Sequence, residues 1–427
     1  DRRQRQMCIR DRNMFVLRQL HNKINTTVVS MSIICLMLFM TITILSSALS
    51  LNNTMRKDLE DTTPVDLNLY KTANLPENEK MSKAQIEDSR KTMIQTLEDN
   101  GFDMTKLKDV VEIPIYATNE LTWRDTLSPV YDEVKQQFPN LLYETAEEIV
   151  KVSDYNKIAR LYGNIEYQLK DDEYIILCDF DNMKNLRNKA LKADSTITIA
   201  GKEYKSKYDE CQNGYIYMAG SHINNGIVLV PDSCNLTEDM KEETFLAANY
   251  NATTEEEKEE IEKICTGETE TEFSKNLNEK DITIDGMTKI AIIESSLGVS
   301  TIVLFIAIYL GIIFLIASSA ILALKQLTES SDNKQRYAIL RKIGADEKMI
   351  KGALFKQIGI FFLMPLILAI IHSIFGIQFV MTMMSVLADA KELLPSAIAT
   401  AVIIGVIYGA YFMATYLGSK NIIKEAE

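Results

Sequence analysis

Four long stretches without a charged side chain most constrain what this 427-residue chain can fold into. Each is long enough for a helix of about 20 residues that crosses a hydrocarbon core about 30 Å thick. Because backbone polar groups find no partners in lipid, each stretch is expected to form a continuous helix. The alternative, four buried helices in one soluble core, requires a length and apolarity that are rare in soluble helices. The sequence therefore predicts an α-helical membrane protein with four transmembrane helices, whose uncharged stretches are residues 26–51, 302–324, 358–381 and 395–419.

The distribution of basic residues predicts how these helices are oriented. Residues 325–357 contain eight basic and four acidic side chains, whereas the short loop 382–394 contains only Lys391 against Asp389 and Glu392. Lys and Arg are retained on the cytoplasmic side of a membrane. We therefore expect a multi-pass protein of the cell membrane, with residues 325–357 in the cytoplasm and the loop outside. Basic residues just before the first span and just after the last place both ends of the chain in the cytoplasm.

The long segment between the first two spans is then predicted to lie outside the cell. It carries 28 basic and 49 acidic side chains and is large enough to have its own core. The predicted order is a cytoplasmic juxtamembrane segment 13–25, a transmembrane helix 26–51, an extracellular domain 52–294, a transmembrane helix 295–324, a cytoplasmic coupling elbow 325–357, a transmembrane helix 358–381, an extracellular loop 382–394, a transmembrane helix 395–419 and a cytoplasmic tail 420–427.

The first twelve residues are set apart from this scheme. Residues 1–12 read "DRRQRQMCIRDR", which resembles translated sequencing-adaptor sequence. We expect them to be non-native and exclude them from the charge argument. The alternative is a genuine basic arm next to the membrane.

The predicted extracellular domain has the pattern of a mixed α/β fold. Helices are expected at 81–100 and 154–162, ended by Gly101 and Gly163, with Ser153 as the N-cap of the second. A third, highly charged helix is expected at 252–265. Runs rich in β-branched residues predict strands at 110–117, 174–178, 195–201 and 226–231.

Motifs that carry chemistry are mostly absent from the sequence. There is no G-x-x-x-x-G-K-[ST] phosphate loop, so this chain is not expected to hydrolyse ATP by that machinery. His21, His222 and His372 fall in three different compartments and cannot share a metal. His222 is best interpreted as a turn or surface histidine, and His372 as a neutral imidazole bonded to a neighbouring helix, although an ionisable group inside a membrane is by default a functional hypothesis. We expect no catalytic, cofactor-binding or metal-binding residue in this chain.

Four cysteines lie in the predicted extracellular domain, where oxidation is allowed. Their spacing matches no zinc pattern, and they permit three pairings. One or two structural disulfides and free buried thiols both remain open for Cys178, Cys211, Cys234 and Cys265.

Small residues in the spans indicate helix packing. The second span aligns Ala307 with Gly311, and Pro365 is expected to kink the third. Small residues at intervals of four let helix backbones approach closely, although one G-x-x-x-G is a weak signal. The fourth span carries such a stripe at Ala397, Ala401, Gly405 and Gly409.

The basic segment 325–357 has the pattern of two helices joined at a hinge. Ile339 and Ile343 share a face of the first helix, Gly344 suits a left-handed C-cap, and Asp346 can cap the second helix, on which Ile350 continues the apolar pattern. This predicts an amphipathic elbow that offers a docking surface. The alternative is a basic loop that only sets topology.

With these residues the chain resembles the FtsX-like permeases of ABC transporters, and within them the BceB-type permeases associated with antimicrobial-peptide resistance. The resemblance rests on "LKQLTESSDNKQRYAILRKIGADEKMIKGALFKQ", "FFLMPLILAIIHSIFGI" and "LRQLHNKINTT". It implies that the elbow receives an ATPase subunit through Arg341, Lys342, Ile343, Gly344, Ala345 and Asp346. A MacB-like unit has R-E-I-G here, whereas this chain has Arg336 followed by Tyr337, so individual contacts do not transfer. In the family these four spans are the last four of ten, which predicts that this chain is a C-terminal fragment.

The resemblance implies a permease subunit that couples ATP hydrolysis to conformational change in the extracellular domain. Its expected partners are a cytoplasmic ABC ATPase, acting as a dimer and binding ATP and Mg²⁺, a sensor histidine kinase, and a peptide or lipid-linked ligand, but no nucleic acid. Two alternatives stay open. One is another FtsX-like unit for lipoprotein release or cell-division signalling, and the other is a membrane receptor without an ATPase.

Overall fold

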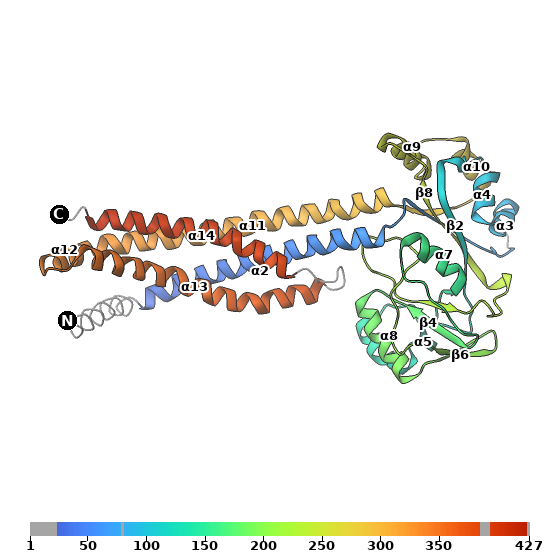
Figure 1. The fold of residues 1–427 in the computed structure, drawn as a ribbon, viewed down its shortest axis with the longest axis horizontal. Helices are drawn as coiled ribbons and strands as arrows, with labels where there is room; N and C mark the ends of the chain where they lie inside the picture. The colour runs from blue at the N-terminus through green and yellow to red at the C-terminus, as the bar shows by residue number, and fades with distance from the viewer. Residues whose placement is uncertain (1–23, 78–80, 385–392, 425–427) are drawn as a thin grey trace. The chain divides into compact units, whose positions relative to one another are not determined.

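The computed structural model describes residues 24–77, 81–384 and 393–424 (Figure 1). Two compact units divide the described chain. The helical unit contains residues 24–54, 299–384 and 393–424, and the α/β unit contains the described part of 55–298. The predicted segment 1–12 lies outside the described residues, and so does the predicted segment 13–25 except for residues 24 and 25. Most of the predicted loop 382–394 and the last three residues of the predicted tail 420–427 also lie outside them.

Long helices form the helical unit, as predicted. Four of them are long and apolar enough to cross a membrane, so the four uncharged stretches form long apolar helices as predicted. The side of the membrane on which each end lies stays a prediction. The helices are α2 (Ile24–Thr62), α11 (Lys289–Asp332), α12 (Lys334–Lys342), α13 (Glu347–Met384) and α14 (Leu393–Lys424).

Glycines allow close contacts between these helices. A Cβ built on Gly311 of α11 would lie 2.6 Å from Cγ of Leu45 on α2, and one on Gly376 of α13 would lie 2.7 Å from the ring of Phe39. Oγ1 of Thr41 also donates to the carbonyl of Gly311 at 3.3 Å. The aligned small residue Gly311 is therefore a true packing position. Helix α13 continues through Pro365.

The small-residue stripe of α14 lies elsewhere. Ala397, Ala401 and Gly405 are exposed in the helical unit, and nothing lies within 4 Å of a Cβ built on Gly405 or Gly409. Within the described chain, α14 instead packs through a buried face that includes hydroxyl groups. Its buried residues are Ser396, Thr400, Ile404, Tyr408, Thr415, Ser419 and Ile423. A packing role for the stripe stays a prediction.

One mixed sheet forms the centre of the α/β unit, with the strand order β5-β6-β4-β7-β3-β2-β8-β1-β9. The pairs β3–β7 and β4–β6 are parallel and the other neighbours are antiparallel. The strands are β1 (Leu67–Thr72), β2 (Leu107–Tyr116), β3 (Ile149–Lys151), β4 (Glu173–Leu177), β5 (Thr196–Ile199), β6 (Lys202–Ser206), β7 (Ile227–Val230), β8 (Lys241–Tyr250) and β9 (Asp285–Thr288).

Both faces of the central strands are buried. Ile175 and Leu177 of β4 pack in one hydrophobic cluster, whereas Tyr174 and Ile176 pack in another, because successive strand residues point to opposite faces. Helix α7 covers the first face and α8 the second. The helices of this unit are α3 (Lys83–Ser89), α4 (Met93–Asp99), α5 (Trp123–Thr126), α6 (Tyr131–Gln137), α7 (Val152–Tyr162), α8 (Asp181–Ala193), α9 (Glu255–Cys265) and α10 (Glu272–Lys280), with single 3-10 turns η1 (Met104–Lys106), η2 (Ser128–Val130) and η3 (Glu238–Met240).

Two of the predicted helix boundaries are wrong. The single helix 81–100 is two helices, because Thr92 accepts a hydrogen bond from the backbone of Gln95 and so begins α4 anew. Ser153 does not cap α7. Its backbone N–H donates to Oδ1 of Asp232 at 3.2 Å, and the N-cap residue is Lys151. The predicted helix end at Gly163 is confirmed by its positive φ of 74°.

Candidate functional site

The elbow in residues 325–357 has the predicted two-helix form. Gly344 follows α12 with φ 86°. At the start of α13 the backbone carbonyl of Asp346 accepts from the N–H groups of Met349 at 2.8 Å and Ile350 at 3.1 Å, and its Oδ1 accepts from the backbone N–H of Lys348 at 3.4 Å. Only glycine adopts such a φ without strain. The predicted positive φ at Gly344 is therefore confirmed.

Arg341 holds the elbow to two other helices. Its Nε donates to Oε1 of Glu347 on α13 at 2.6 Å, and its Nη1 donates to the backbone carbonyl of Ile423 on α14 at 2.7 Å. Its guanidinium group therefore makes hydrogen bonds within this chain. The neighbouring Lys342 and Gly344 are exposed, whereas Ala345 is half-buried.

The apolar residues of the elbow divide into two sets. Ile350 and Leu354 are buried in the core of the helical unit. Ile339 and Ile343 are 58% and 74% exposed. Two exposed isoleucines one helical turn apart, beside Arg336 and Lys342, form an apolar patch with a basic rim. We call Ile339 and Ile343 the elbow patch.

A second candidate site is a cavity of about 770 Å³ in the α/β unit. An irregular segment, residues 215–226, forms much of its wall and is held by side chains from elsewhere in the unit. The hydroxyl of Tyr162 donates to the carbonyl of Ile216 at 2.7 Å, and the backbone N–H of Met218 donates to Oδ1 of Asn68 at 2.8 Å. Thr62 also donates to the carbonyl of Ala219 at 2.6 Å. The wall is therefore a fixed structure without regular secondary structure.

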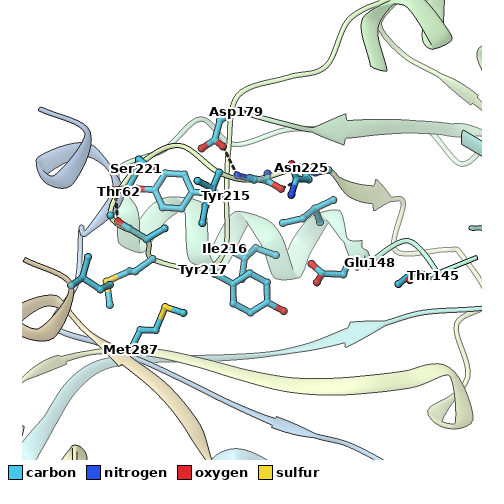
Figure 2. A pocket seen from close by; sticks show the side chains of 18 of the residues that line it. Thr62, Thr145, Glu148, Asp179, Tyr215, Ile216, Tyr217, Ser221, Asn225 and Met287 are labelled. Carbon is cyan, nitrogen blue, oxygen red and sulfur yellow. Dashed lines mark hydrogen bonds between the residues drawn. The ribbon is translucent and has the colours of Figure 1, made fainter. Parts of the chain in front are cut away.

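The cavity is largely apolar and carries a few polar groups. Figure 2 shows Tyr215, Ile216, Tyr217 and Met287 around it, with Glu148 and Asp179 on its walls. This combination of an apolar lining and a small number of polar groups is typical of ligand sites. Further apolar lining comes from Leu141, Leu142, Met218, Ile223 and Ile292.

Two carboxyl groups in and beside the cavity have unusual pKa values. Burial, together with the negative charges of Glu243, Glu242 and Glu147, raises the pKa of Glu148 to about 7. Burial likewise raises the pKa of Glu243 to about 7, although a hydrogen bond of 2.7 Å from the hydroxyl of Tyr217 opposes that change. Both residues are half-buried, and carboxyl groups with strongly raised pKa values in or beside a cavity are candidates for function.

The neighbouring acids Glu147 and Glu148 have opposite surroundings. Glu147 is fully buried and accepts two hydrogen bonds from Arg187, at 2.9 and 3.0 Å. Glu148 points to the other face of the sheet, and its carboxylate has no ion pair or hydrogen bond within the described part of the chain. Its carboxylate is directed into the cavity (Figure 2). No sequence motif marks Glu148, so sequence reasoning missed it.

His222 and His372 contact neighbouring side chains, whereas the four cysteines of the α/β unit are not joined in disulfides. Nδ1 of His222 lies 2.9 Å from Oδ2 of Asp179, a contact that raises the pKa of the imidazole. His372 makes an edge contact with the ring of Phe39. Within the described residues no cluster of three or more His, Cys, Asp or Glu side chains could hold a metal ion. The structure has free thiols at Cys178, Cys211, Cys234 and Cys265.

Comparisons with known proteins identify the helical unit. Residues 311–426 match the FtsX-like permease C-terminal family. The bacitracin export permease BceB of Bacillus subtilis is 38% identical over 108 residues, 25% of this chain and 16% of that protein. BceB of Halalkalibacterium halodurans is 33% identical over 124 residues, 29% of this chain and 18% of that protein.

A third similarity extends into the α/β unit. The uncharacterized ABC transporter permease YvcS of Bacillus subtilis is 22% identical over 302 residues, 70% of this chain and 44% of that protein. The chain thus spans less than half the length of each of these relatives. Residues 311–426 thus match the FtsX-like permease C-terminal family, and part of the chain is similar to BceB bacitracin export permeases.

Proposed function

We propose that this chain is a permease subunit that couples ATP hydrolysis by a separate cytoplasmic ATPase subunit to conformational change in the α/β unit. The observation that carries this proposal is the elbow patch. Ile339 and Ile343 are exposed on an ordered two-helix elbow, inside the region that matches the FtsX-like family. ATP and Mg²⁺ would bind to the partner.

The chemistry of the elbow supports a protein partner rather than lipid alone. Exposed apolar residues surrounded by basic side chains suit a groove with an apolar floor and an acidic rim. Arg341 ties the elbow to α13 and α14, so force applied at the patch would reach two long helices. The charge distribution of the sequence supports a cytoplasmic location for the elbow and an extracellular location for the α/β unit.

The ligand class follows from the named relatives and the cavity. The two bacitracin export permeases carry the name of a peptide antibiotic. The cavity of about 770 Å³, largely apolar and with carboxyl groups, suits part of a peptide rather than a whole one. We therefore propose that the α/β unit engages antimicrobial peptides or their lipid complexes, in the same assembly as the ATPase and a sensor histidine kinase.

The test is co-purification of the full chain with the candidate ABC ATPase subunits of its source organism. We expect a stable complex, weakened about tenfold or more by Ile343→Ser, because burying an isoleucine at an interface contributes about 2 kcal/mol. Ile165→Ser is the matched control, since Ile165 is 61% exposed in the α/β unit. Absence of a complex with the unmodified chain would favour a receptor that works without an ATPase.

A further inference from the structure

The unpaired carboxylate of Glu148 is a feature of the cavity that the coupling function does not use. Glu148 is half-buried, and removing a carboxylate even partly from water without a partner costs free energy, so native proteins ordinarily pair such groups. Glu147, the preceding residue, is paired with Arg187, whereas Glu148 on the opposite face has no such partner among the described residues. The chain therefore maintains a costly group at the wall of a cavity.

The surroundings of Glu148 determine which ligand group would suit it. Tyr217 also lines the cavity, and its hydroxyl donates a hydrogen bond to Glu243. Glu243 is therefore a second acidic group, behind the cavity wall. Asp179 is a third acid on the lining, and it accepts hydrogen bonds from His222 and Asn224. An anionic ligand group would be repelled by this wall, whereas a cation would be attracted to it.

We propose that Glu148 is the recognition residue of the cavity for an ammonium or guanidinium group carried by a ligand with apolar flanks. This inference rests on the proposed function, in which the α/β unit engages a peptide. The carboxylate would form a charge-assisted hydrogen bond with the cation. The apolar wall, including Ile223 and Met287, would bury the neighbouring apolar groups of the ligand.

An organic cation fits this cavity better than a metal ion does. Divalent metal ions are held by several oxygen ligands, and no cluster of three or more suitable side chains occurs among the described residues. One free carboxylate in a largely apolar cavity of about 770 Å³ instead matches a side chain such as that of lysine, with its apolar stem and charged end.

The ionisation state of Glu148 makes the proposal sensitive to pH. With a pKa of about 7, much of the free site is protonated below neutral pH. Because a cation binds the ionised form of Glu148, the affinity of the site for a cation should rise between pH 6 and pH 8. Binding of the cation should release a proton from Glu148 where the free site is protonated. The charged groups that act on Glu148 are Glu243, Glu242 and Glu147, the last paired with Arg187. The other titratable groups of the cavity are Tyr215, Tyr217 and Asp179, which is paired with His222.

The experiment compares two peptides on the full chain in lipid nanodiscs by calorimetry. The probes are acetyl-Leu-Lys-Leu-amide and its norleucine analogue, which lacks the charge and keeps the stem. At pH 8 we expect the lysine probe to bind about tenfold more tightly, a difference of about 1.4 kcal/mol. Glu148→Gln should remove this preference and leave the norleucine probe unchanged. It should also abolish the rise in affinity between pH 6 and pH 8.

Two control variants separate the site from general electrostatics. Glu120→Gln removes the same charge from an exposed position and should keep the preference. His222→Gln should keep the pH dependence if Glu148 is the titrating group. Equal affinity of the unmodified chain for both probes, no measurable binding of the lysine probe, competition by Ca²⁺ alone, or equal losses in Glu120→Gln and Glu148→Gln would each overturn the proposal. None of these outcomes bears on the ATPase complex, which is tested separately.

Discussion

Nη1 of Arg341 donates a hydrogen bond of 2.7 Å to the backbone carbonyl of Ile423, so the elbow is joined to the last turns of α14. The same guanidinium bonds Glu347 through Nε at 2.6 Å. Because the side chain of Arg341 is only 16% exposed, it does not act as a free surface charge. The resemblance assigned it to the elbow, and the structure adds that it connects three helices of the helical unit.

Arg341→Lys should reduce coupling while leaving ATPase binding intact. Lysine keeps the charge but has a single donor nitrogen, so it cannot place separate donors where Nε reaches Glu347 and Nη1 reaches Ile423. We expect ligand-stimulated ATP hydrolysis of the complex to fall about threefold to tenfold, in line with the loss of one charge-assisted hydrogen bond. ATPase assays on the reconstituted complex measure this. Lys342→Arg, at an exposed neighbouring position, is the control, and an equal effect of both changes would contradict the role of Arg341.

Gly344→Ala should destabilise the elbow through the backbone alone. No atom lies within 4 Å of a Cβ built there, so the change meets no steric clash, but the φ of 86° disfavours any residue other than glycine. We expect a cost of about 1 kcal/mol and weaker binding of the ATPase.

Gly352→Ala provides the matched comparison for Gly344. Gly352 lies inside α13, with open space around it, so alanine there should be neutral or stabilising by about 0.5 kcal/mol. Hydrogen exchange of residues 334–357 measures local opening in both variants. Equal protection in the two variants would show that the positive φ is not required.

The raised pKa of Glu148 predicts how stability depends on pH. The folded protein binds a proton more tightly than the unfolded chain, whose glutamate has a pKa near 4.5. This contribution to stability is fully present below pH 4.5 and is lost as pH rises through about 7. Glu148→Gln should therefore raise the stability of the α/β unit at pH 8 by about 1 to 2 kcal/mol and leave it unchanged at pH 4.

Thermal unfolding of the full chain in detergent, followed across pH 4 to 8, checks this expectation. Glu120→Gln serves again as the control, because its exposed carboxyl should not change the midpoint. A lower midpoint for Glu148→Gln at pH 8 would mean that the carboxylate stabilises the fold. A higher midpoint would fit a group retained for binding at the expense of stability.

The predicted topology is tested by labelling with an impermeant maleimide on intact cells. In a chain whose own cysteines are replaced by alanine, Lys258→Cys on α9 should react and Lys348→Cys at the elbow should not. After the membrane is opened, both should react. Reaction of position 348 but not 258 in intact cells would reverse the orientation.

Local sequence patterns accounted for several elements of the fold. The uncharged stretches identified all four long helices, since length and apolarity act locally and need no partner. Gly163 and Gly344 were correctly assigned positive φ, because the preference of glycine for this region is a property of the residue itself. The capping box that begins α4 at Thr92 could also be read in the sequence, where Gln95 follows three residues later.

The sheet and the cavity depended on contacts between distant residues. Strand β8 contains Ala247, Ala248 and Asn249, which have low β propensity, and it is a strand because β1 and β2 pair with it on both sides. The sequence by itself thus determined the spans, the hinge and the family resemblance. Only the tertiary structure decided that the carboxylate of Glu148, in a segment rich in acidic residues, lies at a cavity without a partner among the described residues. Burial and missing partners depend on segments far apart in the chain, so no local pattern distinguishes Glu148 from Glu147.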